Sequence, residues 1–530
     1  MEKRGINLRE NGVFLLFLLG MAIYYGWRMF ALVPWYDELY TYYYFISRGP
    51  VYAAIHWPLP NNHVGYSVLS ACLTVFGSSA VALRGVSYLC SLFSLTLLYR
   101  IGKKRIKGAA ALIPVFLFAG INIVNQLAVQ GRGYALVTFC YLMAVYELQK
   151  MAEEKEERLS GYVLFSGALL MALWAIPSSV YMVLPVCIAG GFYFLLSGKK
   201  KKLFHLILAS LASAAGTAFL YGLLWLAIGS NLLAKTEGSL YYGMGHFQIL
   251  RKAPIQALRE GIDYMLASPY IQSVPREGFL ASFAAWLQTL LGTQYRYLSF
   301  WGSLLFWIVV VAATCLLCLF FLIRGYRRVG RKFRPDFFAI FFLISALMLP
   351  GMLIAQCKLP YYRVFSFAAA LLCLMSGQLV VWVQESRLLS DRTGRIARTA
   401  GTVLAFLLCV AAIGRGSGQY SHRDAMLADI YRNMPAAQTE KIAVTDCDQE
   451  YLLLYQLGID GERTTRALEE ADWVVLDKYL LGTEGYADKQ EEPELWKLYL
   501  AREEVPAEYL EGSMTPFYEN DYFVLFQKKK

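Results

Sequence analysis

Two adjacent carboxylates, Asp37 and Glu38, are the side chains in this sequence best suited to do chemistry. They stand in the segment PWYDELY at 34–40, directly after an apolar run at 13–33. A carboxylate in a pocket can take a proton from an attacking hydroxyl group. The alternative is a solvated loop or a helix N-cap, because acidic residues favour the first turn of a helix.

Ionisable side chains recur at the ends of other apolar runs: Arg84, Arg132, His63, Lys358 and Arg363. Such residues are functional by default when they face the interior of a helix bundle. Guanidinium and ammonium groups bind phosphate. Cations beside a carboxylate therefore fit a reaction in which a hydroxyl attacks while a phosphate is held.

The elements that must position these residues are membrane-spanning helices. The chain has 530 residues, of which 57% are hydrophobic and 17% are charged, whereas a soluble protein carries about 25% charged residues. About 20 apolar residues cross the hydrocarbon core as a helix. This rule predicts about eleven spans, at 12–34, 80–101, 109–125, 133–149, 161–177, 180–197, 203–229, 299–323, 336–356, 362–384 and 399–414.

The net charge of +11 is a topology signal and does not indicate nucleic-acid binding. Clusters of Lys and Arg precede the first predicted span and follow the second, fourth, sixth, eighth and tenth. Positively charged loops stay in the cytoplasm. We therefore expect a multi-pass plasma-membrane protein with a cytoplasmic N-terminus. The loops 35–79 and 230–298, and everything after about residue 415, are then extracytoplasmic.

The sequence predicts two domains, a multi-span domain at 1–414 and a small extracytoplasmic α/β domain at 415–530. In the second domain, 441–445, 471–476 and 522–526 have strand composition. A helix at 446–457 would begin at Asp446 as its N-cap. The alternative for Asp446-Cys447-Asp448 is a metal site, but a helix cap explains Asp446 adequately.

An ordered series of motifs resembles the GT-C class of membrane glycosyltransferases. The series is WYDE-x-Y at 35–40, NH-x-x-Y at 62–66, FGSS at 76–79, LRGVS at 83–87 and QGRGYAL at 130–136. It is similar to the protein O-mannosyltransferases and the lipid A aminoarabinose transferases, a glycosyltransferase family 39-like group. The similarity covers about residues 12–150, and the fold it implies is polytopic α-helical with a small extracytoplasmic domain.

The resemblance implies that a sugar passes from a polyprenyl-phosphate donor to a lipid, protein or glycan acceptor, with inversion at the anomeric carbon. Asp37 would be the general base, and Glu38 would orient the acceptor or support a cation. Arg84, Arg132 and His63 would bind the donor phosphate. The residues expected to bind substrate are Tyr36, Tyr40, Asn62, Lys358 and Arg363.

Several alternatives stay open. Relatives carry Lys-Pro-Pro or His-Pro-Pro where this chain has Asn62-His63-Val64-Gly65, so local hydrogen bonding is the other role for His63. The tyrosines at 36, 40 and 42–44 also fit an aromatic belt at the membrane interface. No cofactor is required, and a divalent cation beside Asp37 and Glu38 is the alternative, although two carboxylates are too few to define a site.

The rival function classes are a transporter or lipid-linked glycan flippase, and a non-catalytic scaffold. Transporters often have internal repeats with paired broken helices, and the sequence has no second half that repeats the first. A scaffold would not need Asp37.

Overall fold

The computed structural model describes residues 8–57, 62–154, 156–267, 273–295, 298–329, 335–385, 391–416, 418, 421–435, 439–482 and 493–529. Residues 58–61 of the expected loop 35–79 lie outside these residues, as do Arg331, Lys332, Arg334 and Arg387 of the basic clusters that follow the eighth and tenth predicted spans. The chain divides into two compact units. The first comprises 1–26, 51–69 and 86–417, and the second comprises 27–50, 70–85 and 418–530.

Eight helices of the described residues are long and apolar enough to span a membrane. They are α1 (Leu8–Ala31), α5 (Ser79–Arg105), α10 (Val180–Leu196), α11 (Lys200–Lys235), α15 (Phe300–Val329), α16 (Phe337–Gln356), α17 (Ser366–Glu385) and α18 (Asp391–Gly416). The predicted polytopic helical membrane protein is thus confirmed.

The other three predicted spans are helices that fall short of this length or hydropathy. The span at 109–125 is broken into α6 (Ile113–Gly120) and α7 (Asn122–Leu127), because Ile121 is extended and the Asn122 N–H bonds to the carbonyl of Gln294 at 2.7 Å. The span at 133–149 is α8 (Tyr134–Glu153), whose last turns are charged. The span at 161–177 is α9 (Leu159–Ala175), which ends before Pro177.

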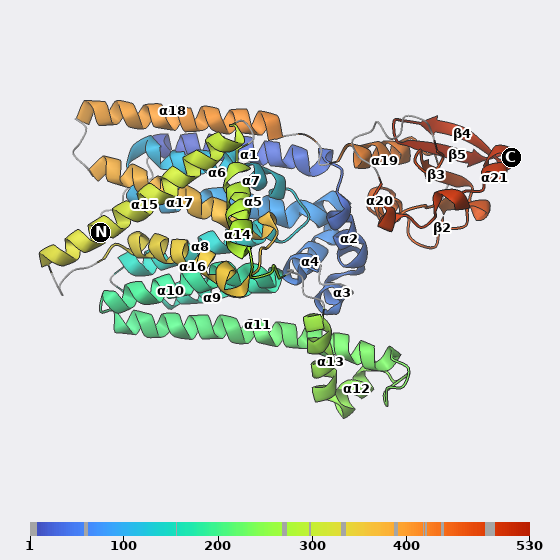
Figure 1. The fold of residues 1–530 in the computed structure, drawn as a ribbon, viewed down its shortest axis with the longest axis horizontal. Helices are drawn as coiled ribbons and strands as arrows, with labels where there is room; N and C mark the ends of the chain where they lie inside the picture. Colours follow the sequence, from blue (N-terminus) through green and yellow to red (C-terminus); the bar gives the residue numbers. More distant parts are fainter. Residues whose placement is uncertain are drawn as a thin grey trace. The chain divides into compact units, whose positions relative to one another are not determined.

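Long helices pack side by side in the first unit. Helix α10 packs against α11 and α16, and α8 packs against α9 and α17 (Figure 1). Helix α13 (Pro254–Ala267) packs closely on α11. A Cβ on Gly229 would lie 1.7 Å from the carbonyl oxygen of Ala257, and one on Gly261 would lie 2.0 Å from that of Trp225. Only glycine allows this approach of the two backbones.

The two predicted long loops contain helices. The segment 35–79 forms α2 (Tyr36–Tyr44), α3 (Pro50–Ile55), α4 (Val64–Cys72) and 3-10 turns at Ile46–Arg48 and Leu73–Phe76. The segment 230–298 holds the end of α11, then α12 (His246–Lys252), α13 and α14 (Phe279–Gly292).

The C-terminal part of the second unit is a five-stranded mixed sheet in the order β2-β1-β3-β5-β4. The strands are β1 (Ile442–Ala443), β2 (Thr464–Thr465), β3 (Trp473–Asp477), β4 (Met514–Glu519) and β5 (Phe523–Lys528). β1 is parallel to β2 and β3, whereas β5 is antiparallel to β3 and β4. The predicted strands correspond to β1, β3 and β5.

Three helices accompany this sheet, namely α19 (His422–Arg432), α20 (Cys447–Leu457) and α21 (Ala507–Ser513). Asp446 is the N-cap of α20, where its carboxylate accepts the Gln449 N–H at 2.7 Å. The predicted cap is confirmed. The apolar core of the sheet includes Val474, Leu476 and Phe526.

Candidate active site

Helix α2 carries both carboxylates in its first turn. The side chain of Asp37 is half-buried, and its Oδ2 atom is shielded from solvent. The hydroxyl of Thr41 donates to the Asp37 carbonyl at 2.7 Å, one turn further along the helix. Asp37 is therefore only partly exposed to solvent.

Glu38 and Arg84 form a bidentate ion pair in the second unit. Arg84 donates from Nε to Oε1 at 2.8 Å and from Nη2 to Oε2 at 3.0 Å, and both side chains are 0% exposed. The Nη1 atom of Arg84 donates to the carbonyls of Met29 at 3.0 Å and Leu32 at 2.6 Å. The Trp35 N–H donates to Glu38 Oε2 at 3.3 Å. One guanidinium thus joins the end of α1 to the start of α2.

In this geometry Glu38 and Arg84 are each other's ion-pair partners. The Arg84 guanidinium makes four hydrogen bonds to protein oxygens and so has a structural role; its phosphate-binding role stays a prediction. Glu38 supports a cation here, and that cation is Arg84. Both Glu38 oxygens accept from Arg84.

The tyrosines of α2 pack against the C-terminal helix α20 of the same unit. The rings of Tyr43 and Tyr451 lie 4.6 Å apart, and Tyr36 and Tyr40 are each 6.2 Å from Tyr451. For these tyrosines, the alternative of an aromatic belt at the membrane interface stays a prediction. Their rings face other protein rings because they repeat at the helical spacing of one face.

A second group of predicted residues meets in the first unit around His63. The Gly133 N–H donates to His63 Nδ1 at 2.9 Å, and Arg132 Nη2 lies 3.3 Å from Nε2. Burial lowers the pKa of His63 well below its usual range, and the charges of Arg132 and Arg363 lower it further. His63 is neutral at physiological pH, and with Nδ1 accepting it carries its hydrogen on Nε2.

The turn that contains Arg132 is held by hydrogen bonds from α5. The hydroxyl of Ser87 bonds to the carbonyls of Gln130 at 2.6 Å and Arg132 at 3.2 Å. Gly133 fits closely next to it, because a Cβ there would lie 3.1 Å from Ile176 and 3.4 Å from His63 Nδ1. Two segments of the motif series, around 87 and 130–133, thus meet in space.

Arg363 joins this group through Tyr134. Its guanidinium carbon lies 6.0 Å from the Tyr134 ring centre, and the Tyr134 ring meets His63 edge-on at 5.0 Å. His63 and Arg363 therefore both lie against the Tyr134 ring, and Arg132 lies against His63. We call these three residues the cation cluster, after the two arginines that flank the neutral His63.

Asn62 and Lys358 have other surroundings. The amide nitrogen of Asn62 donates to the carbonyls of Ala53 and His56, both at 2.9 Å, and its oxygen accepts from Ser67 at 2.7 Å. The buried amide holds its loop in place, and a substrate contact of Asn62 stays a prediction. Lys358 is held by a backbone bridge to Ser273.

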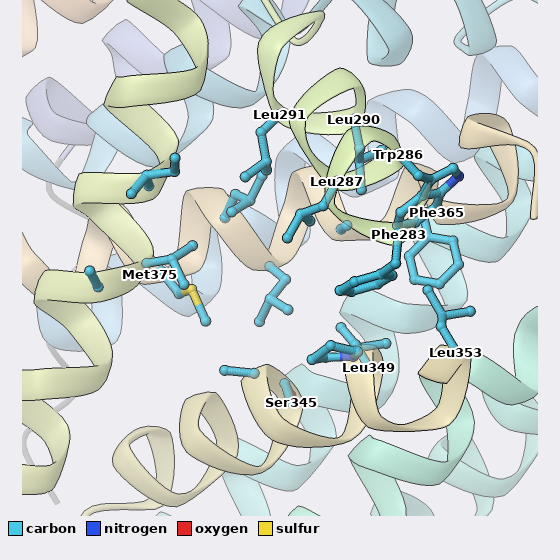
Figure 2. A pocket seen from close by; sticks show the side chains of 18 residues that line it. Phe283, Trp286, Leu287, Leu290, Leu291, Ser345, Leu349, Leu353, Phe365 and Met375 are labelled. Atoms are coloured by element: carbon cyan, nitrogen blue, oxygen red, sulfur yellow. The ribbon is translucent and has the colours of Figure 1, made fainter. Parts of the chain in front are cut away.

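An apolar cavity of about 330 Å³ lies between α14, α15, α16 and α17. Figure 2 shows Trp286, Leu290, Leu349, Phe365 and Met375 around it. The Trp286 indole N–H is satisfied by the carbonyl of Pro360 at 2.8 Å, so the lining is almost wholly apolar. Phe365 and Arg363 belong to one 3-10 turn, Tyr362–Phe365, which links the cavity to the cation cluster.

Among the described residues, no group of three or more His, Cys, Asp or Glu could hold a metal ion. This includes the segment at Asp446-Cys447-Asp448, where Asp446 is engaged as a helix cap.

A family model described as dolichyl-phosphate-mannose-protein mannosyltransferase matches residues 63–225. The matched part is less than a third of the chain, and it contains His63, Arg84 and Arg132. The match supports a membrane glycosyltransferase. It confirms the predicted resemblance and supports a lipid-linked sugar donor.

Two solved membrane enzymes resemble the chain at 14% identity. One is the archaeal oligosaccharyltransferase AglB from Archaeoglobus fulgidus, in complex with an inhibitory peptide and a dolichol-phosphate. It has a TM-score of 0.46, with 88% of this chain and 70% of that chain covered. The other is ArnT from Cupriavidus metallidurans bound to undecaprenyl phosphate, with a TM-score of 0.45 and coverage of 97% and 98%. No curated protein matches the sequence.

Some residues of this candidate site have no clear signal in the sequence. Tyr134 stands in the QGRGYAL motif, but nothing there shows that its ring lies between His63 and Arg363. Trp286 and Phe365 read as ordinary apolar residues. Tyr451 lies more than 400 residues from α2 in the sequence, so only the folded chain reveals their contact.

Proposed function

We propose that this chain is an inverting glycosyltransferase of the GT-C class. In this proposal it transfers a sugar from a polyprenyl-phosphate carrier to a hydroxyl acceptor on the extracytoplasmic side of the plasma membrane, and its N-terminus is cytoplasmic. The observation that carries the proposal is the family match over 63–225, which includes two of the three members of the cation cluster.

Asp37 is the general base of the proposed reaction. It takes the proton of the acceptor hydroxyl while that oxygen forms a bond to the anomeric carbon. The bond between this carbon and the phosphate oxygen breaks, and the polyprenyl phosphate leaves with the electron pair. A single displacement inverts the anomeric carbon. The half-buried position of Asp37 at the start of α2 supports this role.

The cation cluster binds the phosphate of the carrier. His63 Nε2 and Arg132 Nη2 lie 3.3 Å apart, and because Nδ1 already accepts from Gly133, both atoms carry hydrogens to donate. The two N–H groups would otherwise point toward each other with no acceptor between them. An anionic phosphate oxygen can accept from both, and such charged hydrogen bonds are strong. The leaving group gains its main stabilisation from such preorganised donors.

The apolar cavity accommodates part of the carrier's hydrocarbon chain. Its lining offers isoprenoid units an environment like that of lipid, at a gain of about 25 cal/mol per Å² of buried apolar surface. The shared turn Tyr362–Phe365 brings the cavity wall and Arg363 together, as a ligand with an anionic head and an apolar tail requires.

The proposal is tested by incubating the purified protein with a panel of polyprenyl-phosphate sugars, starting with mannose, and a mixture of hydroxyl acceptors. We expect consumption of one donor and a product of inverted anomeric configuration, measured by mass spectrometry and NMR. In Asp37→Asn, we expect transfer to fall about 10²- to 10⁴-fold, with normal membrane insertion.

Asp263→Asn is the matched control, because Asp263 forms an exposed pair with Arg259. It should transfer sugar at the rate of the unaltered protein. Full activity in Asp37→Asn would contradict the assignment of the base. Movement of the intact donor across a vesicle membrane without a new glycosidic bond would instead favour the transporter or flippase.

A further inference from the structure

The helix that carries Asp37 is held by the C-terminal region of the chain. Helices α2 and α20 pack against each other within the second unit (Figure 1). Helix α2 has only nine residues, and a helix shorter than about 12 residues is marginal by itself. Its direction must therefore come from tertiary contacts, of which the Glu38–Arg84 pair supplies one set.

A ring cluster supplies the second set of contacts. Tyr451 lies 4.6 Å from Tyr43 and 5.7 Å from Tyr44, and its hydroxyl bonds to that of Tyr44 at 3.4 Å. Glu450 accepts from Tyr43 at 3.0 Å and from Tyr499, a residue of the C-terminal region, at 2.7 Å. The Glu450 carboxylate thus connects α2 to the C-terminal domain.

Lys497 reaches the residue next to Asp37. Its Nζ lies 4.3 Å from the centre of the Tyr36 ring, and Trp496 meets the same ring edge-on at 5.2 Å. Lys497 is itself fixed by Asp448 at 3.1 Å and Glu494 at 2.9 Å. A cation placed over an aromatic ring attracts it electrostatically, so Tyr36 is held on the side of α2 that faces the C-terminal domain.

We propose that the C-terminal domain is a positioning module for α2, in which Lys497 and Tyr451 fix the direction of Asp37. This rests on the proposed function, in which Asp37 is the base. Neither residue is catalytic; both are positioning residues that act through Tyr36 and the other rings of α2. A base displaced by about 1 Å costs about 10²-fold in rate, so these contacts matter for catalysis beyond their part in folding.

The test compares paired variants of the full-length protein in the sugar-transfer assay. Lys497→Met and Tyr451→Leu remove the contact, whereas Lys497→Arg and Tyr451→Phe keep the cation and the ring. We expect kcat to fall about 10- to 100-fold in the first two, with KM for the polyprenyl-phosphate sugar within about twofold of the unaltered value. The conservative variants should recover most of the rate.

Lys478→Met and Tyr518→Leu are matched controls in the same domain. Lys478 pairs with Glu519, and Tyr518 bonds to Asp429, and neither contact involves α2. Both controls should keep kcat. Thermal unfolding checks that each variant is folded. If Tyr451→Leu fails to fold, the two variants Lys497→Met and Lys497→Arg decide the test alone. The Met side chain is close in length to that of Lys, so Lys497→Met opens no cavity.

The proposal is overturned if Lys497→Met keeps kcat while Asp37→Asn loses it. It is also overturned if the donor KM rises while kcat stays the same, or if Lys497→Arg is as slow as Lys497→Met. Full transfer by Asp37→Asn would contradict the proposed function, so the two failures are distinguishable.

Discussion

Glu38 and Arg84 are the residue pair on which the geometry of Asp37 most directly depends. The two side chains exchange two charged hydrogen bonds with no exposure to solvent. Removing one member of such a pair leaves a buried charge without its counterion. The neighbouring position of Asp37 means that any rearrangement of Glu38 also moves the proposed base.

We expect Glu38→Gln and Arg84→Met each to lower the free energy of unfolding by about 3–5 kcal/mol. The double variant should lose less than the sum, because both charges are then gone. Thermal unfolding in detergent measures the effect. The control is Asp263→Asn, whose exposed pair with Arg259 should contribute at most about 1 kcal/mol. Equal losses for the buried and the exposed pair would contradict the structural role of Glu38 and Arg84.

At the scale of elements, the helices α14, α15, α16 and α17 enclose the apolar cavity, and the turn Tyr362–Phe365 ends at its wall. In the sequence, the side chains that line the cavity look like ordinary lipid-facing or core residues, so the sequence alone does not indicate a cavity. Its proposed use for the carrier chain makes the enzyme sensitive to the length of that chain.

Leu349→Trp should fill part of this space. We expect KM to rise for donors with long polyprenyl chains and to change little for donors with a short prenyl group, because only the long chain needs the cavity. Steady-state kinetics with the two donors measures the ratio. Leu347→Trp, on the same helix with its side chain 75% exposed, is the control and should leave the ratio unchanged. An unchanged ratio in Leu349→Trp would place the carrier chain elsewhere.

At the scale of the whole molecule, the C-terminal part of the second unit gathers buried charges around Arg423. The C-terminal domain buries Asp446, Asp448 and Asp477 around Arg423, and Lys497 bonds to Asp448. Three carboxylates thus face two cations. Burial raises the pKa of Asp446 from 3.8 to about 6, against the opposing effect of Arg423.

This pKa gives the domain a pH-dependent stability. Between pH 3.8 and about 6 the folded domain keeps a proton on Asp446 that the unfolded chain has released. The contribution of this group to stability therefore falls as pH rises through that window, and it stays low above it. Asp446→Asn remains neutral throughout and still caps α20.

We expect Asp446→Asn to slow hydrogen exchange in β3, relative to the unaltered protein, more at pH 7 than at pH 4.5. Exchange rates corrected for the intrinsic pH dependence measure local stability. Asp460→Asn, at an exposed turn, serves as the control and should show no change with pH. A difference that is the same at both pH values would contradict the raised pKa of Asp446.

The sequence by itself determined the membrane class, most of the spans, the cap at Asp446 and three of the five strands. These features are local, because a hydrophobic run of about 20 residues, an N-cap or an alternating strand is recognised within a short window. The motif series contains Asp37, His63 and Arg132, and Arg363 was selected as an ionisable residue at the end of an apolar run; their functional roles stay predictions.

Only the tertiary structure decided which of these residues are partners. Arg84 is bound by Glu38, Asn62 holds its own loop, and the tyrosines of α2 face Tyr451. Helices α6 and α9 are shorter than predicted because the chain turns at Ile121 and at Pro177. A hydropathy average over about 20 residues does not detect such a turn. The physical reason is that hydrophobicity sets where a helix can lie, whereas ion pairs and ring contacts form between segments separated by tens to hundreds of residues, and their geometry exists only once the chain has folded.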